Sequence, residues 1–345
     1  MKVENSINDK SEINDKGETR LIAESNWLRW LTSLAPVWTL LVMFIFFSFA
    51  SDSFFSRPNM NNLLVQISTN GILATGMTFV LLTGQIDLSV AAVMGLTGMI
   101  STQMFVDRGI AEPLPTLVGL GVGLFLGFIN GVVSTRFRIQ TFMVTLSMAL
   151  IAEGITLWSS QGHTYFEIAP VADFLGSTWI GGRGEGIRLM IVISAATLLV
   201  GHLVLRYTHF GRYVYMTGAN PSAARLAGVN TNRIIIIAMT VCGFTAALAG
   251  LANTGRLGTA LTIPENGFLI DAIAVVVLGG TSLMGGRGGI AQTVVGLLIY
   301  GTLRNGLDNI PTIDPLTKDF ITGIVLMIAL VINVIFSGRG VRDRT

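Results

Sequence analysis

The sequence YTHFGRYVYMTGANPSAARLAGVNTNR, residues 207–233, separates two apolar runs that are each long enough to cross a membrane. It contains three arginines and a short alanine-rich stretch after Asn220 and Pro221. A connection between two helices needs only about 2–8 residues. This polar segment therefore has room for a structured element on the membrane surface, and such an element can contact a soluble partner.

The composition predicts a membrane protein. Hydrophobic residues make up 51% of the chain, charged residues only 12%, and mean hydropathy is +0.66, whereas soluble domains carry about 25% charged residues. One cysteine, Cys242, and three histidines are too few for a disulfide framework or an obvious metal cluster. The net charge of +2 gives no reason to expect a nucleic-acid partner.

The apolar runs predict an all-α membrane protein with about ten transmembrane helices, because each crossing needs about 20 apolar residues. The expected spans are 34–51, 69–84, 88–106, 115–135, 142–160, 188–206, 233–253, 270–285, 289–306 and 317–337. The second, eighth and ninth are short and are interrupted or flanked by glycine. Such spans often line the substrate path of a transporter, and tilted or partly inserted helices are the alternative.

The basic residues predict that both termini lie in the cytoplasm. In that orientation most of the 22 Lys and Arg residues fall on the inside, as the positive-inside rule favours. An interfacial helix before the first span would be anchored by Trp27 and Trp30. The expected divisions are a cytoplasmic tail and interfacial segment at 1–33, a transmembrane domain at 34–337 with a cytoplasmic loop at 207–233, an outside surface loop at 161–187, and a cytoplasmic tail at 338–345.

Four glycines in the fourth expected span, Gly119, Gly123, Gly127 and Gly131, recur at four-residue spacing. The spacing places them on one helix face, where another backbone can approach closely. Helix packing within the chain is the expected role, and a contact between subunits is the secondary alternative.

Glu153 lies in the middle of the fifth expected span. A carboxylate at that depth is costly unless it faces protein or water. A pore-lining group, a proton site and a helix–helix hydrogen bond all fit this position. The spans offer few further groups for a proton relay, so proton coupling has weak support.

Asp87 and Asp271 stand where helices are expected to begin, and we expect each to cap its helix. The segment GGTSLMGGRGG at 279–289 has the spacing of a weak dinucleotide motif. Its flanks are membrane spans rather than an α/β unit, so we expect a tight cytoplasmic turn. The sequence contains no G-x-x-x-x-G-K-[ST] phosphate loop. If transport consumes ATP, another chain must bind the nucleotide.

Four ordered blocks resemble the ribose-permease family of bacterial sugar ABC importers. The blocks are VLLTGQIDLSVAAVMGLTG at 80–98, RFRIQTFMVTLSMALIAEGI at 136–155, FGRYVYMTGANPSAARLAGVNTNRI at 210–234 and IDAIAVVVLGGTSLMGGRGGI at 270–290. The first 50 residues and the loop 161–187 lie outside the resemblance. Gln85 and Ala91 stand where glycines are common in the family, which leaves the choice of sugar open.

The resemblance implies an ABC importer permease fold in the bacterial inner membrane, which translocates a ribose-like monosaccharide by alternating access. It implies three protein partners: a second permease subunit, identical or different, a cytoplasmic ATPase with two nucleotide-binding domains in one chain, and a periplasmic sugar-binding protein. ATP and Mg²⁺ would bind to the ATPase. This chain would hold no cofactor or metal and would catalyse no chemical reaction.

The resemblance also implies a coupling helix at 220–227, with Gly218 and Gly228 as turn residues. The expected coupling residues are Gly211, Arg212, Gly218, Asn220, Pro221, Ala223, Ala224, Arg225 and Gly228. Arg212 and Arg225 could pair with acids on the ATPase. The positive-inside bias and contact with lipid phosphates are the alternative.

Polar residues in the spans are expected to line the translocation path, because a neutral sugar needs hydrogen-bonding groups of modest affinity. The candidates are Asn70, Thr75, Asn130, Thr145, Glu153 and Asn253, and each alone also fits a helix-packing role. An ion-coupled secondary transporter of a small polar solute is the alternative function, and Glu153 is its obvious acid. The sequence shows no nucleophile constellation for an enzyme and no repeated filter motif for a channel.

Overall fold

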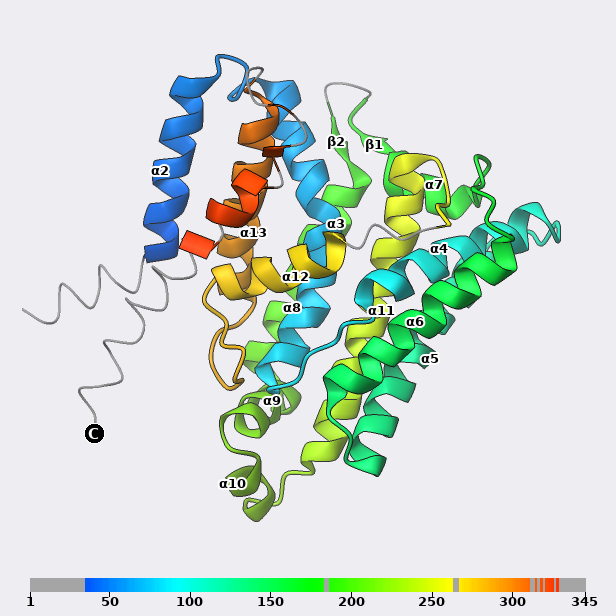
Figure 1. Cartoon of the computed structure of the whole chain (residues 1–345), viewed down its shortest axis with the longest axis vertical. Coiled ribbons are helices and arrows are strands. Elements are labelled where there is room, and N and C mark those ends of the chain that lie inside the picture. Colours follow the sequence, from blue (N-terminus) through cyan, green and yellow to red (C-terminus); the bar gives the residue numbers. More distant parts are fainter. Residues whose placement is uncertain are drawn as a thin grey trace, which may run out of the picture.

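The computed structural model describes residues 35–182, 186–262, 267–310, 314, 317–318, 320–325 and 327–328. These residues form a helical bundle with one small hairpin (Figure 1). The elements are α2 (Ala35–Ala50), α3 (Arg57–Leu82), α4 (Val90–Val106), α5 (Leu114–Phe137), α6 (Thr141–Ser160), α7 (Pro170–Ser177), β1 (Trp179–Ile180), β2 (Ile187–Arg188), α8 (Leu189–Tyr207), α9 (His209–Ala219), α10 (Pro221–Leu226), α11 (Thr231–Leu257), α12 (Gly267–Leu278) and α13 (Ile290–Asp308).

Several described helices suit a membrane. By length and composition, α3, α5, α6, α8 and α11 are long and apolar enough to cross one, and α2, α4 and α12 are shorter apolar helices. Of the expected tenth span at 317–337, residues 317–318, 320–325 and 327–328 are described and are helical; the rest lies outside the described residues. The tails at 1–33 and 338–345, with Trp27 and Trp30, lie outside them as well.

α3 shows that the prediction of a short second span was wrong. The helix has 26 residues and begins at Arg57 rather than at residue 69. Ser56 caps it by accepting a hydrogen bond from the backbone N–H of Asn59 (3.4 Å). The first turns contain polar residues, and Asn59 among them donates to the side chain of Asn305 on α13 (2.8 Å). Hydropathy alone therefore missed them.

α12 is short, as expected, but it ends at Leu278 rather than at residue 285. Twelve residues rise about 18 Å, which is less than the thickness of a bilayer core. The next segment, 279–289, is a turn, as expected. Five of its glycines have φ angles between 71° and 153°, a region that residues with a Cβ rarely adopt. The glycines therefore stop the eighth span early.

α3 and α11 form the centre of the bundle. In the most apolar 18-residue stretch of α3, 89% of the residues are buried, whereas in that of α8 only 22% are buried. α11 packs against α5, α3, α4 and α7. The outer helices α2, α5, α6 and α8 expose large apolar side chains, including Phe49, Phe125, Leu150 and Leu199. An apolar belt of this kind suits contact with lipid.

The glycine face of α5 lies against α11 and α4. A Cβ on Gly123 would stand 2.5 Å from the carbonyl oxygen of Gly243 on α11, and a Cβ on Gly127 would stand 3.1 Å from the Cα of Gly243. Gly131 meets α11 one turn further along, and Gly119 meets the backbone of α4. The two helices therefore touch through their backbones, as small residues at four-residue spacing allow.

The loop 161–187 has more regular structure than the sequence predicted. It contains α7 and the antiparallel pair β1–β2. The guanidinium of Arg188 lies 5.2 Å from the centroid of the Trp179 ring. α7 packs against the end of α11 through Gly176 and Gly255. In Figure 1 this cluster lies at the end of the bundle opposite to α9 and α10.

Candidate functional site

The polar segment 207–233 folds into two short helices, α9 and α10, at one end of the bundle (Figure 1). Thr208 starts α9, because its hydroxyl accepts a hydrogen bond from the backbone N–H of Gly211 (3.1 Å). Gly211 is buried, and a Cβ there would collide with the carbonyl oxygen of Leu205. The chain can therefore turn sharply from α8 into α9.

Asn220 starts α10. Its Oδ1 accepts hydrogen bonds from the backbone N–H groups of Ser222 (3.1 Å) and Ala223 (3.0 Å), and proline occupies the first helical position, where it is well tolerated. The helix Pro221–Leu226 lies inside the expected range 220–227. Gly228 follows it with a φ of 82°, in the left-handed region that favours glycine.

Gly218 is not the turn residue that the sequence suggested. It lies inside α9, where a Cβ would collide with the carbonyl oxygen of Leu82 and stand 2.6 Å from the backbone nitrogen of Gly286. That nitrogen donates a hydrogen bond to the Leu82 carbonyl (2.9 Å). α9, the end of α3 and the glycine-rich turn 279–289 therefore meet through backbone atoms.

Tyr215 adds a second connection between α9 and the glycine-rich turn. Its hydroxyl donates a hydrogen bond to the carbonyl oxygen of Gly288 (2.9 Å). Burial raises the pKa of Tyr215 above its ordinary value. The hydroxyl therefore remains a protonated donor throughout the neutral pH range.

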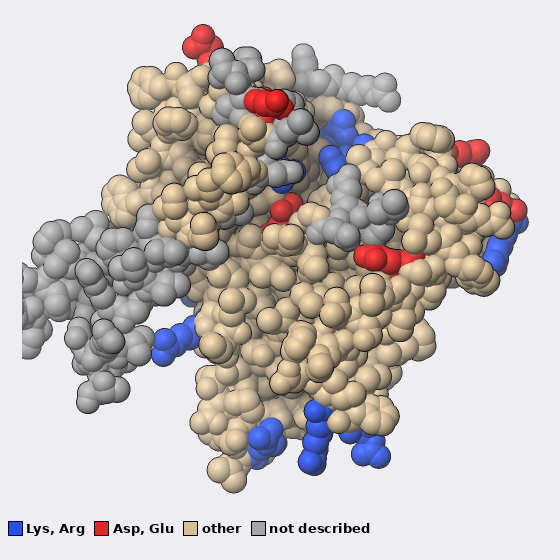
Figure 2. Space-filling model, in the orientation of Figure 1, with Lys and Arg blue, Asp and Glu red and all other residues tan. Residues whose placement is uncertain are grey.

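The exposed residues of α9 and α10 combine an apolar tip with basic side chains. Leu226 is 92% exposed, and Arg212 and Arg225 are exposed, whereas Ala224 is buried. Arg225 donates to the hydroxyl of Thr231 at 3.4 Å. Figure 2 shows Lys and Arg atoms gathered at this end of the molecule. Sequence reasoning overlooked Leu226, although it is the single leucine in the polar segment.

Two predicted path residues, Asn130 and Thr145, hold the turn between α3 and α4. Thr145 accepts from the backbone N–H of Leu88 (3.0 Å), and Asn130 donates to the hydroxyl of Ser89 (3.0 Å). The backbone N–H and hydroxyl of Ser89 both donate to Asp87, at 2.8 and 2.6 Å. Ser89 is the N-cap residue of α4. Asp87 therefore stabilises the turn that precedes α4. It does not accept from the N–H groups of the first helical turn, so the prediction that it caps the helix was wrong.

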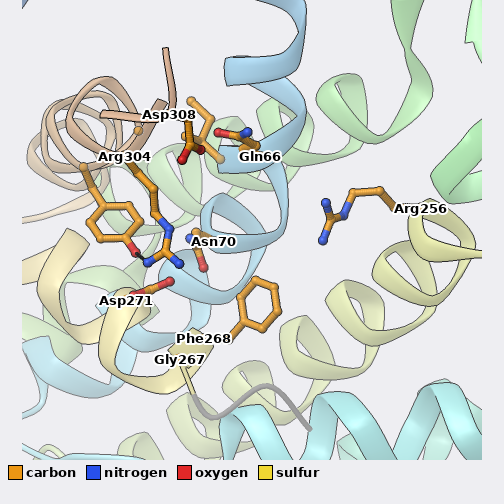
Figure 3. A pocket seen from close by; sticks show the side chains of 11 residues that line it. Gln66, Asn70, Arg256, Gly267, Phe268, Asp271, Arg304 and Asp308 are labelled. Carbon is orange, nitrogen blue, oxygen red and sulfur yellow. Dashed lines mark hydrogen bonds between the residues drawn. The ribbon is translucent and has the colours of Figure 1, made fainter. Parts of the chain in front are cut away.

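A polar cavity of about 390 Å³ lies among α3, α11, α12 and α13 (Figure 3). Its polar and charged lining consists of Gln66, Asn70, Arg256, Asp271, Tyr300, Arg304 and Asp308. Arg256 is in the last turn of α11, a helix of 27 residues whose other end follows α10. The cavity is therefore at the end of the bundle away from α10.

Arg256 forms one wall of the cavity. Its Nε and Nη2 atoms donate to Oδ1 of Asn253 at 3.1 and 2.9 Å, and this oxygen also accepts from the hydroxyl of Thr69 (3.4 Å). Asn253, a predicted path residue, thus holds the arginine that faces the cavity.

The opposite wall contains further charged groups. Arg304 donates to the hydroxyl of Tyr300 (3.1 Å), and Asp308 pairs with Lys318 (2.9 Å). Asp271 lies beside Arg304 in Figure 3. The prediction that Asp271 caps its helix was wrong, because α12 begins at Gly267 and Asp271 lies one turn inside it.

The structure separates the six predicted path residues. Asn70 lines the cavity, and Asn253 supports its wall. Thr75 donates to the carbonyl of Gly71 within α3, and Glu153 is half-buried on α6. The residues that do not line the cavity are Thr75, Asn130, Thr145, Glu153 and Asn253.

Sequence reasoning missed most of the cavity. The expected spans 233–253 and 289–306 stop short of Arg256 and Asp308, but α11 and α13 extend to Leu257 and Asp308 and carry both residues on helices. A four-residue spacing was the available signal: it joins Gln66 to Asn70 and Arg304 to Asp308, which places each pair on one helix face. Within the described ranges, no group of three or more His, Cys, Asp or Glu residues could hold a metal ion.

Comparison with known proteins agrees with these features. The family described as branched-chain amino acid transport system / permease component matches residues 59–330. The chain is 37% identical over 308 residues to the ribose import permease protein RbsC of Escherichia coli strain K12, covering 88% of this chain and 94% of that protein. It is 34% identical over 334 residues to the fructose import permease protein FrcC of Rhizobium meliloti (95% and 92%). It is 29% identical over 351 residues to the xylose transport system permease protein XylH of Escherichia coli strain K12 (84% and 88%). The chain therefore belongs to the family of branched-chain amino acid transport system permease components.

Proposed function

We propose that this chain is the membrane-spanning permease subunit of an ATP-driven, binding-protein-dependent importer that carries a monosaccharide. The observation that carries the proposal is α10, a capped helix with an exposed leucine and basic neighbours, in a chain of the permease family. Relatives named for the import of ribose, fructose and xylose support the choice of a sugar. The chain itself translocates its substrate and does no chemistry.

The proposed topology has about ten spans with both termini in the cytoplasm of a bacterial inner membrane. The support comes from charge: Lys and Arg side chains gather at the end that carries α10 (Figure 2). Cytoplasmic segments of membrane proteins are enriched in Lys and Arg, so this end is assigned to the cytoplasm. The opposite end, with α7 and the polar cavity, then faces the periplasm. This sidedness gives the two ends of the bundle different partners.

On the cytoplasmic side, α10 would dock on an ATPase subunit that binds ATP and Mg²⁺. Leu226 would enter an apolar groove, and Arg212 and Arg225 would meet acidic groups. Movement of α10 would reach the spans through α9, because Gly218 contacts the end of α3 and the glycine-rich turn directly. ATP binding would open the path outward, and hydrolysis would reset it.

Two further partners complete the proposed importer: a second permease subunit and a periplasmic sugar-binding protein. The glycine face of α5 is already covered by α11 and α4, so it cannot supply the contact between permease subunits. A face that is exposed in the single chain must do so. Membership of a family of transport system permease components supports partnering with an ATPase and a binding protein.

Reconstitution would test the proposed function. The chain is placed in liposomes with its ATPase, the binding protein is added to one side, and uptake of ribose, fructose and xylose is measured. We expect uptake of one sugar that needs both ATP and the binding protein. Uptake that proceeds without the ATPase under an ion gradient would instead establish the secondary transporter.

A further inference from the structure

The polar cavity is lined by four helices of this chain. Its lining comes from α3, α11, α12 and α13, and Figure 3 shows Arg256 and Arg304 approaching it from opposite sides. Its volume of about 390 Å³ lies at the lower end of the roughly 300–1,000 Å³ typical of small-molecule sites. The cavity has room for one small solute.

Asn70 is the group in this cavity that most clearly calls for a ligand. The residue is 4% exposed and lines the cavity wall, yet its Oδ1 has no hydrogen-bond partner. Most buried side-chain polar atoms in proteins are paired. In Figure 3 the amide lies between Arg304, Asp271 and Phe268. This oxygen is buried, so a hydroxyl entering the cavity would supply the missing donor once the amide rotates toward the cavity.

The surrounding charges favour a neutral solute. Arg256 and Arg304 face Asp271 and Asp308, so neither sign dominates and no strong field selects a simple anion or cation. Aspartates only accept hydrogen bonds and arginines only donate them, whereas a hydroxyl group does both. A solute with several hydroxyl groups can therefore serve both kinds of side chain at once.

The cavity also has an apolar side. Phe268, on α12, is 8% exposed and lies below the amide of Asn70 in Figure 3. Its ring can pack against the C–H face of a sugar ring, while the hydroxyl groups point to the charged wall. The lining therefore combines an apolar face with several polar groups, and convergent polar groups of this kind fix the orientation of a small ligand.

We propose that this cavity is a monosaccharide-binding site within each permease chain, on the side that faces the binding protein, and that Asn70, Asp271 and Phe268 contact the sugar. The sidedness and the sugar class rest on the proposed function. The site would receive the sugar before the path between the subunits opens.

The test measures sugar binding to the permease–ATPase complex in lipid nanodiscs, without the binding protein. Saturation-transfer NMR is recorded with D-ribose, D-fructose, D-xylose and, as a zwitterion of similar size, L-leucine. We expect signal from at least one sugar and none from L-leucine. A lost hydrogen bond weakens binding roughly fivefold, so Asn70→Leu should reduce the signal by about that factor at subsaturating sugar. Asp271→Asn should also reduce it, because a neutral amide oxygen accepts a weaker hydrogen bond than a carboxylate.

Asn70→Leu separates a binding role from a structural one. In the empty site the amide oxygen has no partner, so replacing it with an apolar group of similar size should leave the thermal stability unchanged or higher. Asn62→Ala is the matched control, because Asn62 is exposed on the same helix outside the cavity. Basal ATP hydrolysis by each complex reports correct assembly.

Two outcomes would overturn the inference. Wild-type sugar binding in both Asn70→Leu and Asp271→Asn would place the sugar elsewhere, and binding of L-leucine in place of sugars would reject the ligand class. Neither outcome requires the proposed function to fail, because ATP-dependent sugar uptake is scored separately in liposomes. If that uptake is absent for every sugar, the proposed function fails on its own.

Discussion

Replacing Gly218 with alanine places a methyl group where α9 touches the end of α3. The new Cβ would collide with the carbonyl oxygen of Leu82 and stand 2.6 Å from the nitrogen of Gly286. These two atoms are joined by a hydrogen bond of 2.9 Å. The neighbours are backbone atoms and cannot rotate away, so either α9 or the glycine-rich turn must shift.

The cost follows from these contacts. Overpacking costs roughly 1–3 kcal/mol, and loss of the backbone hydrogen bond costs about 1 kcal/mol, while alanine regains at most about 1 kcal/mol through helix propensity. The contact between α9 and the end of α3 should therefore be destabilised by about 1–3 kcal/mol. Coupling energies of this size correspond to about 5- to 150-fold.

The assay measures sugar uptake and ATP hydrolysis in the same liposomes that contain the complete complex. We expect Gly218→Ala to lower the ratio of sugar transported to ATP hydrolysed by at least about fivefold. Gly154→Ala, on α6, is the control, because its Cβ would meet nothing within 4 Å. An unchanged ratio in Gly218→Ala would refute transmission through this contact.

Three further predictions concern packing, docking and pH. Gly127→Ala should lower the free energy of unfolding of the complex in detergent by roughly 1–3 kcal/mol, whereas Gly121→Ala on the same helix, with open space around it, should cost nothing. Arg225→Glu and Leu226→Ser should each reduce the amount of ATPase that copurifies with the permease while membrane insertion is unchanged; full copurification of both would exclude α10 as the docking helix. Tyr215→Phe should cost about 1 kcal/mol at neutral pH. Because burial raises the pKa of Tyr215 above 10.0, the folded state favours the protonated hydroxyl, so the difference between Tyr215→Phe and wild type in thermal melts should be constant up to about pH 10 and shrink above it.

Local features predicted a structured element in the polar segment, and the resemblance to the permease family supplied the range 220–227. A polar segment of this length between two apolar runs has room for a surface element, and Asn220 followed by Pro221 is typical of a helix start. The actual helix, Pro221–Leu226, falls inside the expected range. Side chains of Asn and the ring of proline act on their own neighbouring backbone, so no distant contact is needed.

Helix ends depended on distant contacts. α3 begins in a polar stretch, at Arg57, where Asn59 pairs with Asn305, a residue far away in the chain. Gly218 was expected to turn the chain, but the carbonyl of Leu82 lies against it and makes its small size a packing requirement. A hydropathy average along the chain holds no information about these two long-range contacts, so it predicts neither the start of α3 nor the role of Gly218.

The amino-acid sequence alone determined that the chain is a helical membrane protein of the permease type, where its main apolar helices lie, and which polar segment leaves the bundle. The membrane character, the helices and the polar segment follow from the transfer of side chains into lipid and from interactions over a few residues, whereas the permease type follows from the resemblance of four sequence blocks to a known family. Only the tertiary structure decided which polar residues share a cavity. Asn70, Arg256, Asp271 and Arg304 come from four different helices, and the backbone packing of those helices, not the spacing along the chain, brings them together.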